Sequence, residues 1–127
     1  MKNDISTRED IELLLYNFYN RILKDNSISY IFTDVAKLDI KKHIPVIADF
    51  WEDILFNKRM YTNNPMKIHL DLNEKTPLLK QHFDTWLHHF TVAVDELFEG
   101  QKSLLAKQRA RSVATVMQIK IALKSKT

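Results

Sequence analysis

Apolar residues recur at helical spacing in four long stretches of the chain. The first stretch covers residues 6–25, where apolar positions fall three or four residues apart and form one stripe. The stretches over 40–57, 77–99 and 102–123 repeat this period. A shorter stretch, 65–72, has fewer apolar positions between two polar loops. The pattern therefore predicts an all-α chain of four long helices and one short one.

Residues with special backbone preferences mark the expected ends of these helices. Ser6 followed three residues later by Glu9 matches a capping box. Asp39 can cap the second helix, in which Pro45 is tolerable only near the start and can distort the turn that carries His43. Asn64–Pro65 and Thr76–Pro77 read as a cap followed by the first helical residue. Gly100, the only glycine, is expected to cap the C-terminus of helix 77–99.

Composition narrows the class of protein. The length of 127 residues predicts one domain over 1–127, and one glycine and three prolines leave few tight turns for a β-rich fold. Without cysteine, disulfides and thiolate metal sites are excluded, so any metal needs His or carboxylate ligands. No apolar run reaches the ~20 residues that span a bilayer, and the N-terminus has no signal-peptide pattern. We expect a soluble cytoplasmic protein.

Net charge is +3, with basic residues concentrated in the last 26 positions. These basic residues lack the interleaved aromatics of a strand-binding surface, so we expect a solvated helix face and no nucleic-acid partner.

Polar residues interrupt the aromatic inner faces of the helices at three positions: Tyr19, His43 and Trp86. A buried tyrosine or tryptophan needs a hydrogen-bond partner, and each of the three could simply be a satisfied core residue. His69, on the short helix, could be a buried hydrogen-bonding residue, a catalytic base or a metal ligand. Together with the flat apolar surface, these residues also fit a haem cavity with an imidazole ligand on one side and donors on the other.

Several stretches together resemble the truncated haemoglobins of the third group. The resemblance covers nearly the whole chain, and its motifs are specific jointly rather than singly. The stretches are "NFYNRILKD", "YIF", "KKHIPVIADFWEDIL", "YTNNPMKIHLDL" and "HFDTWLHHFTVAVDELFEG".

This resemblance implies a shortened globin, a 2-on-2 helical sandwich around haem b. His69 is similar to the proximal iron ligand, and Tyr19 and Trp86 are similar to distal hydrogen-bond donors. His43 corresponds to the distal gate and Ile47 to the apolar residue above the iron. Six residues correspond to pocket walls: Phe32, Phe50, Trp51, Met66, Leu72 and Phe90.

Two positions depart from the family pattern. Asn63 stands where members often have glycine, and asparagine tolerates a left-handed conformation nearly as well. Pro45, two residues after His43, is less usual and can turn that imidazole toward or away from the iron. Arg59 and Lys67 are candidate partners of the haem propionates by position only.

The implied function is binding of O₂, and of CO, NO, cyanide or peroxide, by a monomer served by an unidentified reductase. Slow release of O₂ would suit redox chemistry or detoxification better than oxygen delivery. The alternatives are a haem-based sensing module without turnover and a haem-free helical interaction domain. A non-haem metal site at Asp84 and His88 has too few ligands. His82, His88 and His89 are expected at the surface.

Overall fold

The computed structural model describes residues 2–35, 37, 39–56 and 78–125, without the side chains of 34, 35 and 123–125. This part of the chain is helical and contains no strand, as predicted. The short helix expected over 65–72 lies outside the described residues. The elements are α1 (Arg8–Leu23), the short π-helix η1 (Ile31–Val35), α2 (Ile40–Phe56), α4 (Lys80–Leu97) and α5 (Gln101–Ser125).

The start of α1 is capped one residue later than predicted. Thr7 is the N-cap, and its hydroxyl accepts from the N–H of Asp10 at 3.1 Å. The Asp10 carboxylate in turn accepts from the N–H groups of Thr7 at 3.1 Å and Ser6 at 2.9 Å. The expected pair of Ser6 and Glu9 is therefore wrong. The Asp10 side chain reaches the N–H groups of both Ser6 and Thr7. This favours a capping box that starts at Thr7 rather than at Ser6.

The junction between α4 and α5 also differs from the expectation. Phe98, not Gly100, caps α4, and its N–H donates to the carbonyl of Val94 at 2.8 Å. Gly100 instead opens α5, because its carbonyl accepts from the N–H of Leu104 at 3.0 Å. Its φ of 149° is a conformation that residues with a Cβ rarely adopt.

Asp4, far away in sequence, supplies the side-chain cap of α5. Its carboxylate accepts from the N–H groups of Lys102 and Ser103, both at 2.8 Å, and from the Ser103 hydroxyl at 2.7 Å. Burial alone would raise the pKa of Asp4, but these bonds and the N–H of Ile5 hold it below its usual value. The N-terminal segment is thereby tied to the first turn of α5.

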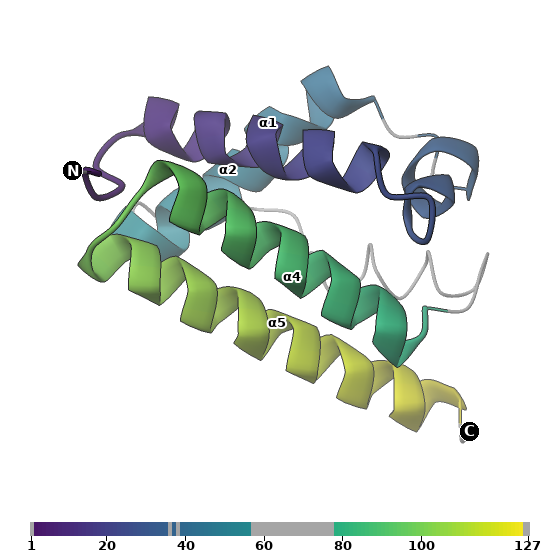
Figure 1. Ribbon diagram of the computed structural model, residues 1–127. Coiled ribbons are helices and arrows are strands. Elements are labelled where there is room, and N and C mark those ends of the chain that lie inside the picture. Colours follow the sequence, from purple (N-terminus) through teal and green to yellow (C-terminus); the bar gives the residue numbers. More distant parts are fainter. Residues whose placement is uncertain (1, 36, 38, 57–77, 126–127) are drawn as a thin grey trace.

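The helices form two pairs that pack across each other. Figure 1 shows α4 and α5 running antiparallel side by side, with α1 and α2 forming the other layer. Ala106, Ala110 and Ala114 recur every four residues along α5 and are at most 3% exposed, so this face offers little side-chain bulk to separate it from its neighbours. Between the layers lies one apolar core, to which α1 contributes Ile11, Leu14, Leu15, Phe18 and Ile22.

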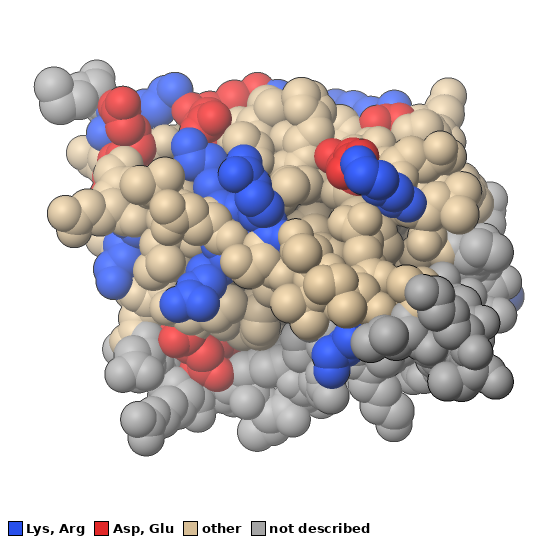
Figure 2. All heavy atoms as spheres, turned by 90° about the horizontal axis from the view of Figure 1, so that it is seen from below, with Lys and Arg blue, Asp and Glu red and all other residues tan. Residues whose placement is uncertain are grey.

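The face on which α5 lies carries many basic side chains. Figure 2 shows Lys and Arg scattered there among uncharged side chains, with a few acidic groups between them. Lys107 is paired with Asp95 at 2.7 Å. Among the described residues, no helix is long and apolar enough to cross a membrane.

Candidate functional site

Tyr19 and His43 form the polar centre of the candidate site. Tyr19 lies on the inner face of α1 and is 5% exposed. Its hydroxyl is 2.8 Å from Nε2 of His43, in the first turn of α2, and the two rings meet edge to face. With Pro45 two residues further on, the imidazole of His43 points toward α1.

Burial makes the Tyr19 hydroxyl harder to ionise. It raises the pKa of the phenol far above its usual value, so the side chain keeps its hydrogen throughout the physiological range. That single hydrogen has two uses. If Nε2 of His43 is protonated, it donates to the Tyr19 oxygen, and the Tyr19 O–H can then donate to a third group. If Nε2 is bare, the hydroxyl donates to His43 instead.

A series of aromatic contacts starts next to this pair, where the Phe18 ring lies 4.9 Å from that of Tyr19. Phe18 meets Trp86 of α4 edge to face, with ring centroids 5.7 Å apart. Phe90, 1% exposed, stacks against Trp51 of α2 at 4.9 Å and against Trp86 at 5.9 Å. Trp86 and Trp51 lie on different helices, and both were predicted to line the site. The Phe90 ring stacks against both of them.

Phe32, in η1, links the polar pair to a small apolar cavity. Its ring meets that of Tyr19 at 6.1 Å. The cavity has a volume of about 50 Å³ and lies between η1, α4 and α5. Its walls include Phe32, Phe83 and Trp86, with Met117 from α5. Two predicted pocket residues, from η1 and α4, therefore face the same apolar space.

The remaining predicted site residues fall into two groups. Ile47 and Phe50 are half-buried and pack against the core from α2. The predicted iron ligand and the residues near it lie outside the described part of the chain, so their roles stay predictions. These are Met66, His69 and Leu72, with the propionate candidates Arg59 and Lys67.

Of the three histidines expected at the surface, His82 is buried and His89 is half-buried, which corrects that prediction. His82 is 7% exposed, accepts from the N–H of Leu79 at Nδ1 (3.0 Å), and contacts the Tyr30 hydroxyl through Nε2 (3.2 Å). His89 contacts the Asp25 carboxylate at 2.8 Å. Only His88 is exposed. His82 lies four residues before Trp86 and eight before Phe90, so its helical register could have revealed it.

His82 has a defined tautomer. Because Nδ1 accepts a backbone hydrogen, the ring proton of the neutral form lies on Nε2 and donates to Tyr30. Burial lowers the pKa of His82, which favours this neutral form. The side chain lines the same cavity as Trp86 and connects the start of α4 to the segment before η1.

These features fit a planar apolar group that binds a small polar ligand on one face. The walls are aromatic and aliphatic, and the polar atoms of Tyr19 and His43 are concentrated at one place between α1 and α2. In haem proteins, hydrogen-bond donors of the distal pocket help to decide what happens to the bound ligand.

Comparisons with known proteins identify the family. The model of the bacterial-like globin family matches residues 3–122. A curated relative, group 3 truncated hemoglobin ctb of Campylobacter jejuni, is 28% identical over 121 residues, covering 93% of each chain. The crystal structure of group III truncated hemoglobin from Campylobacter jejuni superposes with a TM-score of 0.82 at 27% identity, covering 95% of each chain. The predicted shortened-globin fold is therefore confirmed, and the chain belongs to the bacterial-like globin family as a haem-binding globin for gas ligands such as O₂.

Proposed function

We propose that this globin holds haem b through His69 and binds O₂ in a pocket where Tyr19 and Trp86 donate hydrogen bonds to the ligand. In this proposal His43 is the gate residue, and Ile47 lies over the iron. Phe32, Phe50, Trp51, Met66, Leu72 and Phe90 form the pocket walls. The activity is redox chemistry on reactive oxygen or nitrogen species, supported by an unidentified reductase, rather than oxygen delivery.

The observation that carries the proposal is the part-buried contact between Tyr19 and His43. Tyr19 belongs to the apolar core, and the half-buried imidazole of His43, from another helix, lies 2.8 Å from its hydroxyl. Burying two such groups is costly unless they are satisfied. A hydrogen bond to each other satisfies them while the site is empty of ligand, and a bound ligand can become the third partner.

Haem supplies a ferrous iron that binds diatomic ligands, and the chain determines how long they stay. The protonated Tyr19 hydroxyl can donate to a ligand once His43 donates to the Tyr19 oxygen. Trp86 carries an indole N–H that can only donate. Each such hydrogen bond is worth about 1 kcal/mol net, so two of them slow dissociation by roughly tenfold or more.

Slow release favours a chemical role over transport. A carrier must unload O₂ on the timescale of delivery, whereas a protein that reacts the bound ligand benefits from retaining it. In a low-dielectric pocket, donors directed at a ligand that gains negative charge are more effective than in water. Tight binding and charge stabilisation therefore arise from the same side chains.

An absorption spectrum of the purified protein tests the cofactor and its ligand. With added haem, the oxidised, dithionite-reduced and CO-bound forms should show the distinct Soret bands of an accessible haem iron. The variant His69→Ala should lose most haem affinity or change its spectrum. His88→Ala is the matched control, because this exposed histidine should leave the spectrum unchanged. A His69→Ala protein with the wild-type spectrum would refute the assigned ligand.

Stopped-flow measurement of O₂ dissociation tests the donors. Tyr19→Phe and Trp86→Phe should each release O₂ faster, with the largest increase in the double variant. Tyr16→Phe is the control, because Tyr16 is on the same helix but is 44% exposed. Unchanged rates in the double variant would show that neither side chain donates to the ligand.

Turnover distinguishes a reactive globin from a sensing module. We expect the reduced protein with bound O₂ to consume NO, or the ferric protein to consume peroxide, as long as a reductant is supplied. Haem binding without either consumption would instead favour a ligand-binding module.

A further inference from the structure

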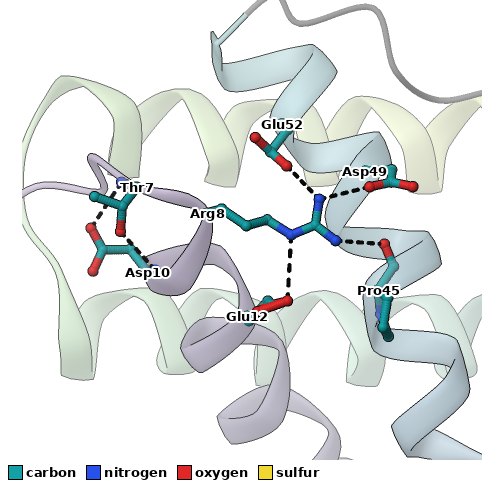
Figure 3. A network of polar contacts seen from close by, with 7 residues as sticks. All are labelled: Thr7, Arg8, Asp10, Glu12, Pro45, Asp49 and Glu52. Carbon is teal, nitrogen blue, oxygen red and sulfur yellow. Dashed lines mark hydrogen bonds and ion pairs between the residues drawn. The ribbon is translucent and has the colours of Figure 1, made fainter.

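Arg8, the first residue of α1, makes the densest set of polar contacts between α1 and α2. Figure 3 shows its guanidinium between the two helices. Nη1 contacts the carboxylates of Asp49, at 2.6 Å, and Glu52, while Nη2 donates to the carbonyl of Pro45 at 3.0 Å. Nε faces Glu12 of its own helix at 3.4 Å. One side chain on α1 thus binds three successive points along α2.

The charge of Arg8 is compensated by a buried carboxylate. Glu52 is 7% exposed, and Arg8 itself is only partly exposed. Burial alone would lower the pKa of Arg8. Its bonds to Glu52 and Asp49 together have the larger effect and hold this pKa above its usual value. Arg8 therefore stays charged, and its removal would leave Glu52 buried without this partner. A planar guanidinium can serve several acceptors at once, which lysine cannot do in the same geometry.

Pro45 lies inside α2, at the point where Arg8 contacts this helix. Proline has no backbone N–H, so the carbonyl of Lys41 receives no helical hydrogen bond from residue 45. The turn ahead of this missing hydrogen bond begins at Ile40 and carries His43. That turn is closed by the N–H of His43, which donates to the carbonyl of Asp39 at 2.9 Å. The turn with His43 therefore has one helical hydrogen bond fewer to the rest of α2.

Arg8 and Tyr19 lie on the same face of α1. They are eleven residues apart, which is close to three helical turns. Tyr19 contacts His43 ahead of Pro45, and Arg8 contacts Pro45, Asp49 and Glu52 at and behind it. The two contacts fix α2 to α1 on either side of the proline.

We propose that Arg8 is a positioning residue for the distal pair. It holds α2 from Pro45 onward against α1, so that His43 stays within hydrogen-bonding distance of Tyr19, and opening of the site is confined to the turn ahead of Pro45. This inference rests on the proposed function, because it gives the clamp a role in retaining the ligand. Without Arg8, α2 can shift along α1, and the hydrogen bond between His43 and Tyr19 weakens.

Ligand kinetics of the haem-loaded protein test this role. Arg8→Met should raise the O₂ dissociation rate by about fivefold, roughly the effect of losing one net hydrogen bond. It should also move the C–O stretching frequency of the CO complex toward that of Tyr19→Phe. Arg21→Met is the matched control, because Arg21 is on the same helix with similar exposure (30% against 26%) but pairs with Glu96 of α4. Wild-type rates and frequency in a folded Arg8→Met protein would overturn the proposal.

A second experiment removes the need for the clamp. Pro45→Ala restores a helical N–H to α2, so the turn with His43 gains a hydrogen bond to the rest of the helix. In this background Arg8→Met should change the dissociation rate less than it does in the wild type. Equal changes in both backgrounds would contradict the coupling between Arg8 and Pro45. Arg8→Lys, which keeps the charge next to Glu52, serves if Arg8→Met does not fold, and should give a smaller change in the same direction.

The haem-free protein gives a readout that does not depend on the cofactor. The ¹⁵N shifts of the His43 ring report its hydrogen bond to Tyr19, and they should change in Arg8→Met and not in Arg21→Met. If the wild-type protein fails to take up haem, the proposed function fails while this measurement still tests the clamp. If haem binds normally but the His43 shifts are the same in both variants and in the wild type, only the clamp is refuted.

Discussion

Replacing Gly100 by alanine tests how α4 is connected to α5. At φ 149° a side chain is strained, and the added Cβ would lie 2.5 Å from Cγ and 2.7 Å from Oδ2 of Asp4. Such a backbone conformation costs about 1–3 kcal/mol for a residue with a Cβ. Displacing Asp4 also removes the cap of α5, worth about 1 kcal/mol. We expect Gly100→Ala to lower the free energy of unfolding by about 2–4 kcal/mol.

Urea denaturation followed by far-ultraviolet circular dichroism measures this loss. The single variant Asp4→Ala should cost about 1 kcal/mol, the value of the cap. In the Asp4→Ala background, Gly100→Ala should cost less than in the wild type, because the conflicts with the carboxylate atoms are gone and only the one with the Cβ of residue 4, at 2.7 Å, remains. A Gly100→Ala protein as stable as the wild type, or equal costs in both backgrounds, would refute the assigned clash.

Three further changes test the packing and the buried histidine. Phe90→Ala removes the ring between the two tryptophans and should lower the free energy of unfolding, measured by urea denaturation, by about 3–5 kcal/mol. Truncating the exposed Tyr16 should lower it by about 0.5 kcal/mol or less. Similar losses in the two variants would contradict the described burial of Phe90. Ala110→Leu adds bulk where α5 is fully buried and should cost about 1–3 kcal/mol, so an unchanged melting temperature would mean that this interface has spare room. Because burial lowers the pKa of His82 in the folded protein, the unfolded chain binds more protons as pH falls through the ordinary histidine value of about 6.5. Stability should therefore decline as pH falls from about 7 toward the folded pKa of His82, and the decline should be smaller in His82→Phe; parallel stability curves for the two proteins would contradict this.

The sequence by itself determined the helices and the direction in which their key residues point. Helical periodicity is a local property, so the observed α1, α2, α4 and α5 closely match the predicted stretches. The same periodicity placed Tyr19, His43 and Trp86 on inner faces, and the structure brings the first two into contact. The jointly specific stretches also indicated a globin, which the family match over residues 3–122 confirms.

The capping pattern was ambiguous at the start of α1, because two neighbouring positions both match it. Ser6 with Glu9 and Thr7 with Asp10 both match a capping pattern, and only the bonds of the Asp10 carboxylate distinguish them. Gly100 was expected to end a helix because it is the only glycine. It opens the next helix instead, where its carbonyl accepts from the N–H of Leu104 and where Asp4 occupies the space that a side chain would need.

Only the tertiary structure decided which polar residues meet across the helices. Arg8 binds carboxylates 41 and 44 residues away, His89 pairs with Asp25, and His82 is buried beside Tyr30. None of these pairs follows from periodicity, because periodicity gives the face on which a residue lies and not the residue opposite it. That partner depends on where two helices cross, and the crossing is set by the packing of the whole apolar core.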